Sequence, residues 1–282
     1  MINKQLSCLL ALSLVLAACS ANEVNEQTPV EENPEKIEVS KDVSDEIENP
    51  VDEPGIEEEP EETEEPAEPE PLYEISEANW TLKPISNANP KAVLLTIDDA
   101  PDRYALEMAQ TLKELNAPAI FFVNGHFLDT EEEKSVLKQI HDLGFPIGNH
   151  TYSHPNLKQL NETEQSTEIV KLNDTVESIL GERPVFFRAP FGANTDYSRQ
   201  LAKDENMLAM NWTYGYDWEK EYRDSASLIE IMVHTPYLTD GAILLMHDRQ
   251  WTAEALPGVV EGLRASGYEL IDPATIKGIE QK

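Results

Sequence analysis

Short apolar segments alternate with longer amphipathic ones from residue 72 onward. The longer segments repeat apolar residues every three or four positions, which is the period of a helix that packs one face against a core. Such alternation is typical of βα units around a parallel sheet. Strands are expected at 92–97, 119–123, 146–148, 185–187, 207–212, 242–246 and 269–271, and helices at 104–115, 131–143, 162–180, 197–203, 226–234 and 254–265.

Seven strands with helices between them predict an α/β fold with a (β/α) barrel. Residues 72–282 number 211, which is enough for one domain with a sizeable core. A complete eightfold barrel typically has about 250 residues, so the barrel is expected to be incomplete. An open doubly wound sheet is the alternative.

The segment 20–71 is strongly acidic, with 21 Asp and Glu residues, two Lys and eight Pro. Its low apolar content leaves too little hydrophobic gain to offset the chain entropy that folding costs, so a disordered linker is expected. Residues 72–282 are also acidic, with 33 acidic and 18 basic side chains. Because phosphate binding needs clustered Lys and Arg, nucleic acid is not an expected partner.

The first nineteen residues have the pattern of an export signal, since Lys4 precedes an apolar run at 9–16 and small residues lead to Cys19. Residues 16–19, Leu-Ala-Ala-Cys, resemble a bacterial lipobox, in which the cysteine becomes the lipidated N-terminus. An ordinary cleaved signal with an incidental cysteine is the alternative. The lipobox predicts a signal peptide at 1–18, a lipidated linker at 19–71 and a domain at 72–282, anchored at the extracellular face of a bacterial membrane. Cys8 would lie in the discarded segment, so no disulfide is expected.

Reactive side chains follow five of the predicted strands, at the point where each strand ends. Because the carboxyl ends of parallel strands share one edge of the sheet, an active site is expected at that edge. The residues are Asp98 and Asp99 after the first strand, His150 and His154 after the third, Arg188 after the fourth, Asp217 and Trp218 after the fifth, and His247 and Asp248 after the sixth.

His150 and His154 are four residues apart, which on a helical turn places both imidazoles on one face. Together with a carboxylate of the Asp98 and Asp99 pair, they form a ligand set that suits zinc and leaves a position for water. The alternative for the aspartates is capping of the following helix, because Asp is a favoured N-cap and Pro101 stands in a first-turn position. The two clusters together favour metal binding.

Three further features point to the same edge. Arg188, beside two aspartates, is expected to hold a carboxylate by charge-assisted hydrogen bonds. His247 ends a buried apolar strand and can exchange protons near neutral pH. Alternate aromatic residues are more often part of a core, but their density here favours a wall for a sugar ring, formed by Trp218, Tyr216 and Tyr214 with Trp212 nearby.

The order and spacing of these motifs resemble those of the polysaccharide deacetylases with NodB homology, carbohydrate esterase family four. The resemblance covers about residues 88–275 and rests on Thr96-Ile97-Asp98-Asp99, His150-Thr-Tyr-Ser-His154, Arg188-Ala-Pro-Phe-Gly192, Asp217-Trp218 and Leu244-Leu-Met-His247. It implies a distorted, incomplete (β/α) barrel of about seven strands. It also implies one divalent metal ion, usually zinc, that serves hydrolysis of N-acetyl groups on amino-sugar polymers. Cobalt or nickel can substitute, because first-row ions share nitrogen and oxygen ligands.

Carried over by position, the resemblance gives each site residue a role. Asp99, His150 and His154 would bind the metal. Arg188 would orient Asp98, the general base, and Asp217 would orient His247, the general acid. Phe191 would offer its backbone N–H to the oxyanion.

Two positions depart from the family pattern: Ala100 stands where glycine usually closes the first motif, and Tyr214 stands where an aspartate often precedes Asp217. These departures bear on substrate fit more than on the chemistry. The expected function is deacetylation of cell-wall peptidoglycan, or of chitin-like oligosaccharides, by a lipid-anchored monomer. A metal-dependent O-acetyl polysaccharide esterase and an inactive glycan-binding lipoprotein are the alternatives.

Overall fold

The computed structural model describes residues 70–279. The predicted signal peptide at 1–18, Cys19 and nearly all of the predicted linker at 19–71 lie outside the described residues. Within 70–279, no helix combines the length and the apolar character needed to span a bilayer.

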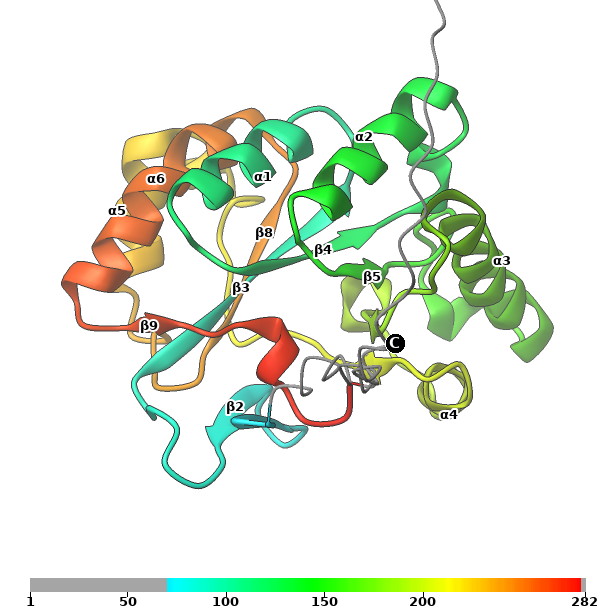
Figure 1. Ribbon diagram of the computed structural model, residues 1–282, viewed down its shortest axis with the longest axis horizontal. Coiled ribbons are helices and arrows are strands. Elements are labelled where there is room, and N and C mark those ends of the chain that lie inside the picture. Colours follow the sequence, from blue (N-terminus) through cyan, green and yellow to red (C-terminus); the bar gives the residue numbers. More distant parts are fainter. Residues whose placement is uncertain (1–69, 280–282) are drawn as a thin grey trace, which may run out of the picture. The chain divides into compact units, whose positions relative to one another are not determined.

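A parallel sheet forms the centre of the fold, with the strand order β7, β6, β5, β4, β3, β8 (Figure 1). A seventh strand, β9, pairs with the start of β3. The strands are β3 (Ala92–Ala100), β4 (Ala119–Val123), β5 (Ile147–Asn149), β6 (Phe186–Phe187), β7 (Leu208–Ala209), β8 (Ile243–His247) and β9 (Glu269–Leu270). All seven predicted strands are present, and the predicted fold class is confirmed.

The sheet curls until its two edges approach each other. Beyond β7, Tyr214 forms an isolated parallel bridge to Leu244 of β8, the strand at the opposite edge. The backbone N–H of Leu245 donates to the carbonyl of Tyr214 at 2.8 Å. One bridge cannot replace a full strand pairing, so the sheet is a curled half-barrel and not a closed one.

Six helices lie around the outside of the sheet, and each contacts the next in the order α5, α6, α1, α2, α3, α4. Their bounds are α1 (Ala105–Glu114), α2 (Glu131–Asp142), α3 (Glu162–Leu180), α4 (Asp196–Asp204), α5 (Ser225–His234) and α6 (Gln250–Ala265). The bounds of α3 match the prediction because Asn161 caps its first turn and Gly181, at φ 85°, ends it. The first turn of α6 begins four residues before the predicted start at 254.

Side-chain alternation along the strands separates two apolar layers. On β3, Val93, Leu95 and Ile97 pack outward under the helices, whereas Ala92 and Leu94 face the inside of the half-barrel. The next two inward positions are Thr96 and Asp98, both buried. The interior therefore changes from apolar to polar toward the carboxyl ends of the strands.

The sequence analysis missed a two-stranded antiparallel hairpin, β1 (Tyr73–Ser76) and β2 (Thr81–Pro84). Tyr73 and Leu82 are buried in the inner apolar layer. Each strand has only four residues, which is the shortest run in which alternation indicates a strand, and Thr-Leu-Lys-Pro of β2 does not keep a strict alternation.

Candidate active site

The two adjacent aspartates leave β3 at an irregular point of the sheet. The pairing of β3 with β4 shifts register between Ile97 and Ala100, and Asp99 has a left-handed backbone with φ 59°. In a regular strand, neighbouring side chains point to opposite faces. The irregularity allows Asp98 and Asp99 to reach the same cavity, and left-handed non-glycine residues of this kind cluster at functional sites.

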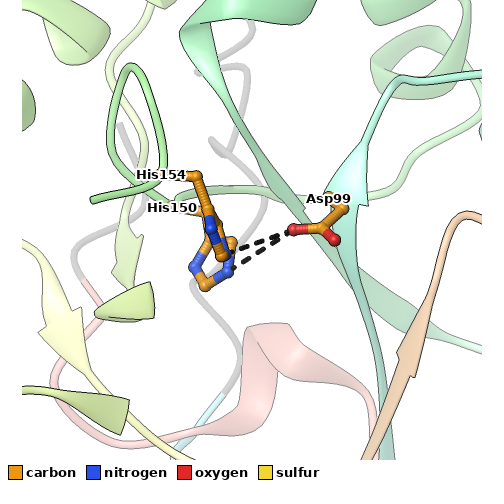
Figure 2. A group of neighbouring side chains, drawn as sticks. All are labelled: Asp99, His150 and His154. Carbon is orange, nitrogen blue, oxygen red and sulfur yellow. Dashed lines mark ion pairs between the residues drawn. The ribbon is translucent and has the colours of Figure 1, made fainter. Parts of the chain in front are cut away.

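Asp99, His150 and His154 lie close enough to share one metal ion. The Asp99 Oδ1 atom is 3.4 Å from Nε2 of His154 and 3.9 Å from Nε2 of His150 (Figure 2). One ligand atom from each of the three side chains lies within 4.8 Å of the others. Two ligands of a tetrahedral zinc ion, each about 2.0–2.1 Å from the metal, lie about 3.4 Å apart, so the separations fit such a site after small adjustment.

The two histidines do not lie on a helical turn, so that part of the prediction is wrong. They belong to an irregular loop after β5, in which Thr151 and His154 have positive φ values of 68° and 58°. The loop is held from outside: Asn149 Oδ1 accepts from the backbone N–H of Thr151 at 2.8 Å. Glu168 accepts from both the backbone N–H and the hydroxyl of Ser153 at 2.7 Å.

Both histidines favour the neutral form that binds a metal. Burial, helped by the charge of His154, lowers the pKa of His150 to about 3. The Nδ1 atom of His150 lies 2.7 Å from the carbonyl oxygen of Arg188. A carbonyl only accepts, so Nδ1 carries the proton and Nε2 presents its lone pair toward Asp99. Burial also lowers the pKa of His154.

A buried ion pair holds the other aspartate. Arg188 Nη1 donates to Asp98 Oδ1 at 2.6 Å, and the two side chains are 0% and 2% exposed. The same nitrogen donates to Thr96 Oγ1 at 2.8 Å, and Nη2 donates to the carbonyl of Asn211 at 2.9 Å. Burial raises the pKa of Asp98 even though the charge of Arg188 opposes the rise. Arg188 thus fixes the carboxylate without removing its capacity to take up a proton.

His247 forms a second acid–base pair with Asp217, which is fully buried. Asp217 Oδ1 lies 2.7 Å from Nδ1 of His247, and Oδ2 accepts from the backbone N–H of His247 at 2.6 Å. The Thr252 hydroxyl also donates to Oδ2 at 2.8 Å. Burial acts to lower the pKa of His247, but the charge and hydrogen bond of Asp217, together with the charges of Asp98 and Asp99, raise it overall.

One cavity of about 600 Å³ at the carboxyl ends of the strands is lined by Asp98, Asp99, His150, His154, Asp217 and His247. Phe191 and Trp218 also line it and are 67% and 40% exposed. Phe191 lies in a short 3₁₀ helix (Pro190–Gly192) and has φ 58°. Because the first N–H groups of a helix have no partner within it, its backbone N–H is available to a ligand. The remaining lining residues are Trp212, Arg223, Leu245, Arg249 and Trp251.

The structure does not bring Tyr214 and Tyr216 to the cavity, so the predicted wall is corrected. The Tyr214 ring is buried, and its hydroxyl donates to the carbonyl of Met232 at 2.7 Å. The Tyr216 hydroxyl lies 2.6 Å from Thr235 Oγ1. Only Trp218 of the three predicted wall residues lines the cavity, whereas Tyr214 lies in the apolar core under the helices and Tyr216 packs against it.

The aspartates do not cap the following helix. Helix α1 begins after Tyr104, without a side-chain cap. Instead, Asp248 accepts from the backbone N–H groups of Asp102, Arg103 and Tyr104 at 2.6–3.0 Å. This long-range contact leaves Asp98 and Asp99 free for the cavity.

The sequence profile of the polysaccharide deacetylase family matches residues 85–210. The chain is 30% identical over 190 residues to a peptidoglycan-N-acetylglucosamine deacetylase of Bacillus cereus. The aligned region covers 65% of this chain and 67% of that protein. The chain is also 30% identical over 184 residues to the peptidoglycan-N-acetylglucosamine deacetylase PgdA of Listeria monocytogenes, of whose length it spans 38%.

Solved structures of the same family also match this fold. A crystal structure of the Bc1960 peptidoglycan N-acetylglucosamine deacetylase matches with a TM-score of 0.62 and 26% identity, covering 69% of this chain and 91% of that one. A pseudoenzyme of carbohydrate esterase family four from Bacillus anthracis matches with a TM-score of 0.59 and 30% identity, covering 66% of each chain. The chain therefore belongs to the polysaccharide deacetylase family. The family includes both proteins named as deacetylases and a pseudoenzyme.

The donor set predicts that the purified protein binds one divalent metal ion per chain. His154→Ala removes one of three donors, so the bound metal measured by inductively coupled plasma mass spectrometry should fall well below that of the wild type. His141→Ala is the matched control, because His141 pairs with Glu182 outside the cavity, and it should leave the metal content unchanged. Equal metal content in the His154→Ala variant and the wild type would contradict the assignment.

Proposed function

We propose that this protein is a metal-dependent hydrolase that removes N-acetyl groups from amino-sugar polymers, with cell-wall peptidoglycan as its substrate. One observation carries the proposal: a single cavity combines a metal donor set, a carboxylate held by an arginine and a histidine held by a carboxylate. The relatives named as peptidoglycan-N-acetylglucosamine deacetylases support the choice of substrate. Zinc is the proposed metal, with cobalt or nickel as substitutes.

Asp99, His150 and His154 would hold the ion, and their two neutral imidazoles and one carboxylate match the ligands that zinc takes in hydrolases. When bound, a divalent cation lowers the pKa of water and polarises a carbonyl oxygen. Hydrolysis of an amide also needs a base to accept a proton from water and an acid to protonate the leaving amine. The cavity offers one group for each task.

Asp98 is the proposed base. It is buried, its Oδ1 is fixed by Arg188, and its Oδ2 lies 3.6 Å from Nε2 of His150, so this oxygen faces the ligand cluster. A carboxylate with a raised pKa accepts a proton more readily than an ordinary aspartate. Arg188 is a positioning residue, because it acts on the reaction through Asp98.

His247 is the proposed acid. Its Nδ1 faces Asp217, which leaves Nε2 as the atom that can donate into the cavity. The raised pKa keeps the imidazole protonated to a higher pH, as protonation of an amine leaving group requires. The N–H of Phe191 would donate to the oxyanion, and a donor of this kind is typically worth about 100-fold to 1000-fold in rate.

Two exposed aromatic rings give the cavity faces on which a sugar ring can pack. The Phe191 ring lies 4.8 Å from that of His154, and the Trp218 ring lies 5.5 Å from that of His247. Each aromatic ring therefore stands beside one of the two chemical centres. A sugar ring between them would present its acetamide to Asp98 and His247.

Activity on N-acetylated glycans tests the proposal. Wild-type protein should release acetate from digested peptidoglycan or chitin oligosaccharides, with a matching loss of acetyl mass. Asp98→Asn keeps the shape but weakens proton acceptance, so kcat should fall by at least about 100-fold while metal content is kept. Asp142→Asn, an exposed carboxylate at the end of α2, is the control. Acetate release only from O-acetylated glycan would instead favour the esterase alternative, and no release from either would favour the inactive glycan-binding one.

The pH dependence of kcat tests the role of His247. Because Asp217 raises the pKa of His247, the acid form persists at higher pH, and activity should fall as pH rises through that pKa. Asp217→Asn removes the charge and lowers the pKa, so the alkaline limb should move to lower pH. Thr252→Val removes one hydrogen bond to Asp217 and keeps the charge, so its shift should be smaller. An unmoved alkaline limb in Asp217→Asn would rule out His247 as the acid.

We also propose that Cys19 is lipidated and anchors the protein at the extracellular face of the membrane. This proposal rests on the sequence of residues 1–71. Cys19→Ser should move the protein from the membrane fraction to the soluble fraction, as immunoblotting would show, because the lipid provides the attachment. Cys8→Ser is the control and should stay in the membrane fraction. A membrane-bound Cys19→Ser variant would refute lipid anchoring at this residue.

A further inference from the structure

We infer that Arg249 is a positioning residue that fixes the carboxylate of Asp99 for metal binding. This inference rests on the metal site of the proposed function. Arg249 Nη2 donates to Asp99 Oδ2 at 2.9 Å, whereas Asp99 Oδ1 faces the two histidines at 3.4 Å and 3.9 Å. One oxygen of the carboxylate is thus directed to the donor cluster while the other is held by the guanidinium.

Arg249 is itself held in place by two contacts beside its own strand end. Its Nη1 donates to the carbonyl of Asp248 at 2.7 Å and lies 3.6 Å from a carboxylate oxygen of Asp102. Among residues 70–279, Arg249 is the only hydrogen-bond donor to the side chain of Asp99. The terminal torsion of an aspartate is broad, so without this donor the carboxylate plane could rotate away from the histidines.

The position of Arg249 in the chain supports a role other than helix formation. It is the N-cap residue of α6, where short oxygen-bearing side chains are preferred, and it makes no side-chain cap hydrogen bond. A positive charge at a helix N-terminus also opposes the helix dipole. A residue that is locally unfavourable on two counts is expected where it serves a functional site.

The arrangement parallels that of the neighbouring aspartate. Asp98 is held by Arg188 and Asp99 by Arg249, so each member of the pair has its own arginine. Arg188 is fully buried and Arg249 is 35% exposed at the cavity. Because Arg249 directly follows His247 and Asp248, one short segment supplies the proposed acid, the anchor of the 102–104 loop and the support of a metal ligand.

Positioning and simple electrostatics predict opposite effects on metal affinity. Arg249 is a cation beside a cation site, so removing its charge alone would strengthen metal binding. Loss of a residue that orients a ligand typically weakens metal affinity by about 10-fold to 100-fold. The sign of the change therefore distinguishes the two.

The experiment measures the dissociation constant of Zn²⁺ by chelator competition on the metal-free full chain. Arg249→Met should weaken binding by about 10-fold or more. Arg249→Lys should show a smaller loss, because it keeps the charge but lacks the planar fork. Arg223→Met is the matched control: Arg223 lines the same cavity and contacts the carbonyl of Trp218 but not Asp99, so its affinity should be equal to or tighter than that of the wild type.

Thermal unfolding of the metal-free variants shows whether each one folds. If Arg249→Met does not fold, the Zn²⁺ dissociation constant of Arg249→Lys is the test of the inference. Zn²⁺ binding by folded Arg249 variants that is as tight as in the wild type, or tighter, would overturn the inference while leaving the proposed function intact. A wild-type protein that binds no Zn²⁺ would refute the metal site itself. Weaker binding in both Arg249→Met and Arg223→Met would also overturn the inference, because the effect would not depend on Asp99.

Discussion

The buried guanidinium of Arg188 connects the parts of the active site. The guanidinium donates to Asp98 and Thr96 of β3 and to the carbonyl of Asn211. The backbone carbonyl oxygen of Arg188 lies 2.7 Å from Nδ1 of His150. The Cζ atom of Arg188 also lies 4.2 Å from the centre of the Phe122 ring of β4. A charge taken out of water at this depth needs a paired carboxylate and hydrogen bonds, which Nη1 and Nη2 have although Nε has no partner within residues 70–279. The surrounding strands must therefore keep their relative positions. The proposed base and one metal ligand are thus fixed by the same residue.

The position of the site follows from strand alternation combined with parallel direction. On β8, Ile243 packs in the inner apolar layer, and two and four positions later Leu245 and His247 line the cavity. Asp98 and His247 are register partners on neighbouring strands. Because both strands run the same way, both become polar at the same edge, and the proposed base and acid come to share one cavity.

Much of this arrangement could be predicted from the sequence, because strand ends are marked by the change from apolar to reactive residues. The loop conformation could not be predicted: the spacing of His150 and His154 suits a helix, but the left-handed residues of the loop depend on contacts with Asn149 and Glu168. The directions of the aromatic side chains could not be predicted from the sequence either. Tyr214 and Trp218 lie in the same loop, yet the tyrosine is buried in the core, where its hydroxyl donates to the carbonyl of Met232 from a distant helix, and Trp218 lines the cavity.

Arg249 shows a related limit. In the sequence it is an arginine at the start of an amphipathic segment, which is usually a solvated side chain. Its contact with Asp99 joins residues 150 positions apart, and only the pairing of β3 with β8 brings them together. The sequence does contain one signal, since an arginine at a helix N-cap is locally unfavourable, but that signal can be read only after the start of α6 is known.

His150 and His247 show how the fold gives two imidazoles opposite protonation states, although burial acts on both. Burial acts to lower the pKa of His150 and of His247 alike. The difference lies in the acceptor at Nδ1. A neutral carbonyl faces His150, so burial prevails and the ring stays neutral, as a ligand must. A buried carboxylate faces His247, so its charge prevails and the ring retains a proton, as an acid must. One cavity can therefore hold a metal donor and a proton donor of the same residue type.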